Sequence, residues 1–177
     1  RLERRVVSDR LASGFAEGGE PDVDSFLKYS LSVQNSRKSR AGQSLENHLE
    51  AIFSARGLRY VRGATTENGN KPDFLFPSVS AYNDAAFPSE KLTMLGAKST
   101  LKDRWRQVLP EARRIESKHL LTLEPAISER QTEQMKAERL QLVVPAGLHS
   151  TYTASQAEWL MRLSDFIELV RDREMTT

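Results

Sequence analysis

Hydrophobic residues recur at helical spacing through much of the chain, beginning near the N-terminus with Leu2, Val6, Val7, Leu11 and Phe15. This periodicity predicts helices over residues 2–17, 22–35, 44–56, 101–114, 128–138 and 155–171. Ser44 is a suitable N-cap for the third helix, and Gly57 is a suitable stop signal at its end. Between the second and third helices, residues 36–43 are polar and basic and predict a loop.

Short apolar runs between these helices predict strands. They fall at residues 58–61, 73–76, 92–98, 119–123 and 140–145. The polar turn of residues 65–70 predicts that the first two strands are antiparallel neighbours, and residues 78–90 predict an irregular loop. The sum is a mixed α/β (α+β) fold, in which helices flank a central mixed sheet.

Composition fits one soluble globular domain, because 38% of the 177 residues are hydrophobic and 28% are charged. We expect residues 1–177 to form a single domain, with a helical lead-in and basic loop over 1–40 and a core over 41–177. Cysteine is absent, which excludes disulfides, thiolate zinc sites and cysteine nucleophiles. The sequence has neither a membrane-length apolar run nor a signal peptide, so we expect a cytoplasmic protein without a membrane partner.

The basic residues are clustered, although the formal net charge is only +2. Any nucleic-acid footprint must therefore come from local groups of lysine and arginine. One group contains Arg37, Lys38 and Arg40, and a second contains Lys98, Lys102, Arg104 and Arg106. In most proteins the first group would be a solvated loop, whereas in a DNA enzyme its residues would bind phosphates.

Asp73 and Lys98 carry the clearest chemical signal. An aspartate at the start of one strand and a lysine at the end of another suit a magnesium-dependent nuclease. Either residue alone is weak evidence, since most such aspartates lie in turns and most such lysines lie on the surface. The acid that PD-(D/E)xK nucleases carry two residues before the lysine is replaced by Gly96. The site is therefore inactive, or another carboxylate completes it.

Helical geometry offers two such carboxylates, Glu46 and Glu111. Glu46 lies at the margin of the apolar face of the helix over 44–56, and Glu111 lies on the flank of the helix over 101–114. Most helix glutamates are solvated and have no catalytic role. Glu46 and Glu111 become candidates only because the Asp73 and Lys98 pair needs a further carboxylate. Pro110 is expected to kink the helix that carries Glu111.

Lys102, Asp103 and Arg104 open that same helix. A helix N-terminus attracts phosphate, arginine can bond guanine, and aspartate can accept from the cytosine amino group. These three residues suit recognition of G·C pairs. An ordinary charged first turn fits the same spacing equally well.

Three segments resemble the catalytic domain of the EcoRII restriction endonuclease family, a branch of the PD-(D/E)xK nucleases. They are Ser44–Glu50, Lys71–Pro77 and Lys98–Gln107, and the last of them is specific. The resemblance runs from about residue 36 to the C-terminus. It implies a type II enzyme that cuts double-stranded DNA at CC(A/T)GG or a related site such as CCNGG, leaving a 5′-phosphate and a 3′-hydroxyl.

The same resemblance assigns roles to individual residues. It places catalytic residues at Asp73, Lys98, Glu46, Glu111, Tyr82 and Lys102, and Mg²⁺ ligands at Asp73, Glu111 and Glu46. Base reading falls to Lys102, Asp103 and Arg104, while Arg37, Lys38, Arg40 and Arg106 would bind phosphate. The implied partners are double-stranded DNA, a second copy in a homodimer, and functionally a cognate DNA methyltransferase. Two alternatives are a DNA-binding module that has lost cleavage and a structure-specific repair nuclease.

Overall fold

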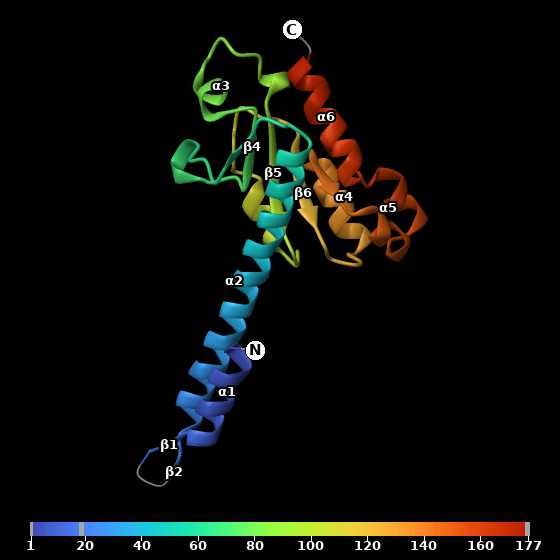
Figure 1. The fold of residues 1–177 in the computed structure, drawn as a ribbon. Helices are drawn as coiled ribbons and strands as arrows, with labels where there is room; N and C mark the ends of the chain where they lie inside the picture. The colour runs from blue at the N-terminus through green and yellow to red at the C-terminus, as the bar shows by residue number, and fades with distance from the viewer. Residues whose placement is uncertain (1, 18–19, 176–177) are drawn as a thin grey trace. The chain divides into compact units, whose positions relative to one another are not determined.

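The computed structural model of this protein describes residues 2–17 and 20–175 (Figure 1). The chain divides into two compact units, Arg1–Ala41 and Gly42–Thr177. That all 177 residues act as one catalytic domain stays a prediction. Within the described residues, no helix combines the length and apolar character that a membrane span needs.

The first unit is built from helix α1, Leu2–Ser13, a short antiparallel ladder of β1, Ala16–Glu17, with β2, Glu20–Pro21, and the start of α2. Phe15 packs against the rings of Phe26 and Tyr29. The predicted helix over 22–35 is confirmed, whereas the predicted helix over 2–17 ends at Ser13 and its last two residues form β1. Helix α2 is a single element, Val23–Ala55, that continues into the second unit.

The predicted loop over residues 36–43 is wrong, because these residues lie inside α2. Ser44 is consequently an interior helical residue and not an N-cap. The segment is rich in residues that the helix tolerates well, and its glycine, Gly42, costs only about 1 kcal/mol in a helix interior. The predicted stop is confirmed, since Gly57 adopts a left-handed φ of 70° directly after the helix.

The second unit contains the predicted mixed sheet, with strand order β3-β4-β5-β6-β7. The strands are β3 Val61–Arg62, β4 Phe74–Phe76, β5 Thr93–Lys98, β6 Lys118–Thr122 and β7 Leu140–Val143. The first two pairings are antiparallel and the last two are parallel. Because β4 and β5 are antiparallel, the start of β4 adjoins the end of β5.

Helices cover both faces of this sheet (Figure 1). One face packs against Leu45, Leu49 and Phe53 of α2 and against α6, Leu163–Met175. The other face packs against the segment after β5, helix α4, Glu129–Ala137, and helix α5, Ala154–Trp159. The predicted apolar face of the helix over 44–56 is thus confirmed, since these three α2 side chains are buried.

The predicted helix over 155–171 is two helices, α5 and α6. Met161 lies between them and forms a parallel bridge with Val143, and its amide donates to the Leu142 carbonyl at 3.0 Å. The sheet edge therefore provides backbone partners that compete with helical hydrogen bonding at this position. The expected loop over 78–90 contains the short helix α3, Val79–Asn83.

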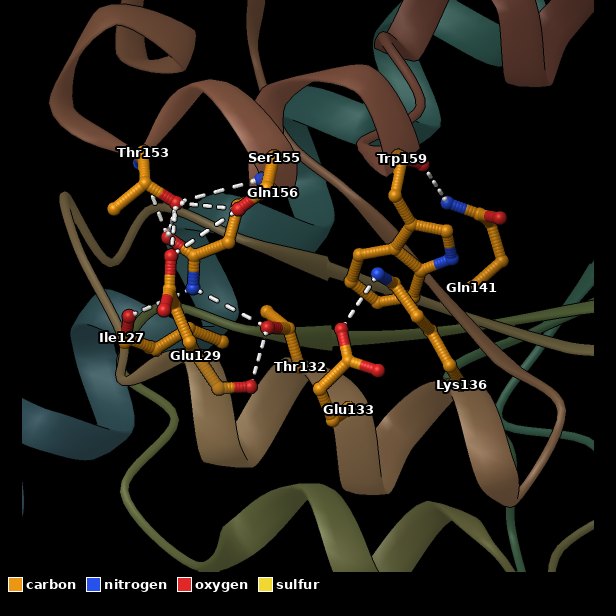
Figure 2. Close-up of polar contacts among 10 residues, drawn as sticks. All are labelled: Ile127, Glu129, Thr132, Glu133, Lys136, Gln141, Thr153, Ser155, Gln156 and Trp159. Atoms are coloured by element: carbon orange, nitrogen blue, oxygen red, sulfur yellow. Dashed lines mark hydrogen bonds and ion pairs between the residues drawn. The ribbon is translucent and has the colours of Figure 1, made fainter.

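Polar side chains fasten α4 to α5 (Figure 2). The Glu129 carboxylate accepts hydrogen bonds from Thr153 and Ser155, and the Gln156 amide donates to Thr132 and to the Ile127 carbonyl. The Lys136 ammonium lies 5.3 Å from the centre of the Trp159 ring. Helix α4 is thereby fixed at both ends.

The predicted helix over 101–114 is wrong. Arg104–Val108 forms a short 3₁₀ helix, followed by a turn. Lys102 and Ala112 have positive φ values of 40° and 47°, which no right-handed helix accommodates. Pro110 supplies no amide hydrogen, so it also interrupts the hydrogen bonding that a continuous helix would need.

Candidate active site

Asp73 and Lys98 meet where the start of β4 adjoins the end of β5. The Asp73 Oδ2 atom accepts hydrogen bonds from Lys98 Nζ at 2.7 Å and from the Ala97 amide at 2.6 Å. The side chains of Asp73 and Lys98 are only 16% and 15% exposed. The sheet therefore brings the predicted pair into direct contact at a largely buried site.

Gly96 shares its face of β5 with Lys98, but that face is filled by other side chains. A Cβ atom added at Gly96 would lie 3.0 Å from Val108 Cγ2 and 3.3 Å from Leu120 Cδ1. An acidic side chain at this position would have to displace a packed core. Steric crowding therefore explains why this position carries glycine and not an acidic residue.

Glu111 brings a carboxylate to the same site from the turn that follows Val108. Its side chain is buried, and Oε2 has no hydrogen-bond partner among the described residues. Burial raises the pKa of Glu111 to about 7, Lys98 and Lys118 oppose this rise, and the nearby Asp73 charge adds to it. A buried carboxylate oxygen without a partner, beside a second carboxylate, fits a divalent cation.

No group of three or more histidine, aspartate or glutamate side chains is gathered around one point in the described part of the chain. The Asp73 charge acts on Glu111, so these two carboxylates share one electrostatic environment. Glu46 as a third ligand stays a prediction.

Glu46 is held by Arg62, a residue that was not predicted from the sequence. The Arg62 guanidinium donates to Glu46 Oε2 at 2.8 Å and to Glu50 Oε2 at 2.8 Å. Arg62 lies opposite Phe74 in the β3–β4 ladder, and Phe74 directly follows Asp73. The i, i+4 spacing of Glu46 and Glu50, which places both on one side of α2, is the sequence signal that could have indicated a shared basic partner.

Tyr82 lies on α3, and its hydroxyl faces Glu67. It contacts Glu67 Oε1 at 2.6 Å and Oε2 at 2.7 Å. Burial, together with the hydrogen bond to Glu67, raises the pKa of Tyr82 to about 12. The phenol therefore stays protonated at neutral pH and acts as a hydrogen-bond donor.

The three predicted base-reading residues are exposed. Lys102, Asp103 and Arg104 surround the first turn of the 3₁₀ helix, whereas the next residue, Trp105, is buried. The Lys102 carbonyl accepts a hydrogen bond from Gln131 of α4 at 3.1 Å. The backbone is therefore anchored while the three side chains face solvent, although Asp103 pairs with the neighbouring Arg106 at 3.1 Å.

A family model described as EcoRII C terminal matches residues 1–167. The chain belongs to this family. It is 47% identical over 167 residues to the type II restriction enzyme EcoRII of Escherichia coli, an alignment that covers 94% of this chain and 40% of that enzyme. It is also 34% identical over 114 residues to the type II restriction enzyme SsoII of Shigella sonnei, covering 57% of this chain and 36% of that enzyme. The chain thus spans less than half of the length of these relatives.

Solved structures share the fold of this EcoRII C-terminal family member. The PspGI restriction endonuclease in complex with substrate DNA superposes with a TM-score of 0.72 at 16% identity, covering 97% of this chain and 72% of that one. Metal-depleted Ecl18kI in complex with uncleaved, modified DNA gives 0.71 at 23% identity, covering 81% and 48%. At these identities the likeness confirms the predicted restriction-endonuclease-like fold and nothing finer.

The basic residues assigned to phosphate binding have other contacts. Arg37 and Arg40 lie on α2 and both pair with Glu3 within the first unit, and Lys38 between them is exposed. Arg106 stacks over the Trp105 ring at 4.4 Å and donates to Gln134 and Asp103. Their role in phosphate binding stays a prediction.

Proposed function

We propose that this chain is the catalytic domain of a type II restriction endonuclease that hydrolyses double-stranded DNA at a short site flanked by C·G pairs, such as CCWGG or CCNGG. One observation carries the proposal. The Asp73–Lys98 pair is accompanied by Glu111, whose buried carboxylate lacks a hydrogen-bond partner among the described residues. Structural packing alone gives no reason to bury such a group.

Magnesium, when bound, would supply positive charge against the scissile phosphate and lower the pKa of a bound water. Asp73 and Glu111 would hold the ion, together with a backbone carbonyl near Ala97. Lys98 would orient or deprotonate the attacking water and stabilise charge on the phosphate. Glu46 would assist the ion or a water, after its pairing with Arg62 adjusts. The products would carry a 5′-phosphate and a 3′-hydroxyl.

Recognition would fall to the exposed residues Lys102, Asp103 and Arg104. Arginine bonds the guanine edge in the major groove, and aspartate accepts from the cytosine amino group. Arg37, Lys38, Arg40 and Arg106 would contact phosphates and contribute affinity without sequence preference. The exposure of the three reading residues supports this division.

The two-fold symmetry of such a DNA site fits a homodimer in which each subunit cuts one strand. A cognate methyltransferase would protect host DNA, and the enzyme would work in the cytoplasm. The alternative of a binding module without cleavage rests on Gly96. The crowding of Gly96 by Val108 and the presence of Glu111 favour a relocated acid over a lost one.

A plasmid digest with Mg²⁺ tests the proposal directly. We expect discrete fragments from the parent and a loss of roughly a thousandfold in rate for Lys98→Ala, because charge stabilisation at the phosphate is removed. DNA binding by this variant should persist. Binding by the parent without cutting would refute nuclease activity, and scattered fragment ends would refute a restriction specificity in favour of a repair nuclease.

A further inference from the structure

The turn that carries Glu111 has an unfavourable backbone conformation. Ala112, the next residue, has a φ of 47°, in the left-handed region that costs a residue other than glycine about 1 kcal/mol or more. Such a conformation persists only when surrounding contacts enforce it. We call residues 109–114 the catalytic turn.

The contacts that hold the catalytic turn come from the loop just before Asp73 and from Tyr82. Four hydrogen bonds join these contacts to the turn. They fall at residues 110, 112, 113 and 114, on both sides of Glu111 in the sequence. They are Asn70 Nδ2 to the Pro110 carbonyl at 3.1 Å, the Ala112 amide to Thr66 Oγ1, the Arg113 amide to Glu67 Oε2, and the Arg114 amide to the Tyr82 hydroxyl, the last three at 3.4 Å.

Glu67 and Tyr82 form the centre of this arrangement. The Tyr82 hydroxyl contacts both carboxylate oxygens of Glu67 at 2.6 and 2.7 Å, so the two side chains are fixed to each other. Glu67 lies in the loop between β3 and β4, six residues before Asp73. One loop therefore contacts the turn that carries Glu111 and leads into the strand that begins beside Asp73.

The far side of the turn is anchored as well. The Arg114 guanidinium donates to the carbonyls of Tyr82, Asp84 and Phe87, which lie in and after α3. The catalytic turn is thus held between the β3–β4 loop and the α3 segment.

We propose that Glu67 and Tyr82 are positioning residues that fix the catalytic turn so that Glu111 stays beside Asp73. In this arrangement the two side chains bond to each other and to amides of the turn. The inference rests on the proposed nuclease function and extends it, since it assigns Glu67, and it gives Tyr82 a supporting role in place of a direct catalytic one. Misplacing a metal ligand by about 1 Å can lower a rate on the order of a hundredfold.

Tyr82→Phe and Glu67→Gln test the proposal, with Tyr60→Phe as the matched control. Tyr60 is partly buried where Tyr82 is buried, and its hydroxyl is hydrogen bonded to Ser54 at 2.7 Å and to the Glu50 carbonyl at 3.3 Å, but it packs on the opposite face of the sheet. The first readout is hydrogen exchange of the amides of residues 111–115 in the metal-free protein. We expect exchange roughly tenfold faster in both test variants, because the turn opens more often, and parental exchange in the control.

The second readout is single-turnover cleavage over a range of Mg²⁺ concentrations. We expect both test variants to need more Mg²⁺ and to lose roughly 10- to 100-fold in the cleavage rate constant, with parental affinity for DNA. The proposal would be overturned if the amides of the turn exchanged at the parental rate in both variants. It would also be overturned if both variants cut DNA at the parental rate with the parental Mg²⁺ requirement. A parent that cuts no DNA would refute the nuclease function, whereas the exchange measurement would still decide whether these residues hold the turn.

Discussion

The catalytic turn and the reading segment, Lys102 to Arg104, lie within a dozen residues of each other after β5, yet they are built differently. Each contains one residue with positive φ, Ala112 in the turn and Lys102 in the reading segment. In the turn the key side chain, Glu111, is buried, and the flanking backbone is hydrogen bonded on several sides. In the reading segment all three side chains are exposed, and the backbone has an anchor in Gln131.

This difference matches the two kinds of chemistry that we propose for these regions. A metal ligand must hold its position before the substrate arrives, so burial and a rigid turn favour it. A residue that reads bases must reach into a groove, so exposure favours it. The network of Figure 2 fastens α4 to α5. Gln131, which anchors the backbone of the reading segment, belongs to this fastened helix. The comparison predicts that changes in the turn alter stability and rate, and that changes in the reading segment alter specificity.

The largest effect on stability is expected from Glu111→Gln in the metal-free protein. The folded-state pKa of about 7 lies above the ordinary value of 4.5, so the unfolded chain releases this proton more readily. The contribution of Glu111 to stability is then most favourable below pH 4.5 and falls as the pH rises toward and through 7, by about 3 kcal/mol at most. The variant removes this penalty. Urea unfolding should show a gain of about 2 to 3 kcal/mol at about pH 8 and almost none at about pH 4.

Equal stability of Glu111→Gln and the parent at the higher pH would contradict the burial of an unpaired carboxylate. It would also remove the contrast between the two regions.

Arg104→Ala should have the next largest effect, and it should act on specificity alone. Loss of an arginine contact to guanine lowers discrimination against a wrong outer base pair by about 1 to 3 kcal/mol. The free energy of unfolding should stay within about 0.5 kcal/mol of the parent, because the side chain is exposed. Cleavage rates on duplexes with matched and altered outer pairs measure the first quantity. Parental discrimination by this variant would exclude Arg104 as a reading residue.

Gln131→Glu should have the smallest effect. The Gln131 amide donates to the Lys102 carbonyl, and its oxygen completes the capping box of α4 with Ser128. Glutamate preserves the box but replaces the donor with an acceptor. We expect discrimination between outer base pairs to fall severalfold, or about 1 kcal/mol, with little change in stability.

Ser128→Ala is the control for that variant. It removes the cap and keeps the amide of Gln131, so it should lower stability by about 1 kcal/mol and leave discrimination at the parental level. Parental discrimination by Gln131→Glu would show that the hydrogen bond from Gln131 to the Lys102 carbonyl has no part in recognition.

The sheet and the central pair could be predicted from the sequence because both depend on local patterns. Alternating or continuous apolar runs located the strands, and the polar turn of residues 65–70 placed the first two strands as neighbours. Asp73 and Lys98 were placed at the ends of two strands, and the antiparallel pairing of β4 with β5, which the sequence did not predict, brings them together. Glu111 was also found, although by reasoning from a helix that does not form.

The errors occur where backbone conformation depends on distant contacts. Ala112 and Lys102 adopt left-handed conformations without a glycine to mark them, and their partners Thr66 and Gln131 are far away in the sequence. Arg62 was missed for the same reason, since its two glutamate partners lie on another element. Propensity cannot encode such contacts.

Single-turnover cleavage of a CCWGG duplex by Glu111→Gln tests the central claim, that Glu111 replaces the acid that Gly96 lacks. Glu116→Gln is the matched control, because Glu116 is 80% exposed and pairs only with Arg139 among the described ion pairs. We predict a loss of roughly a thousandfold for Glu111→Gln at saturating Mg²⁺ and a parental rate for Glu116→Gln. A parental rate for Glu111→Gln would contradict the account.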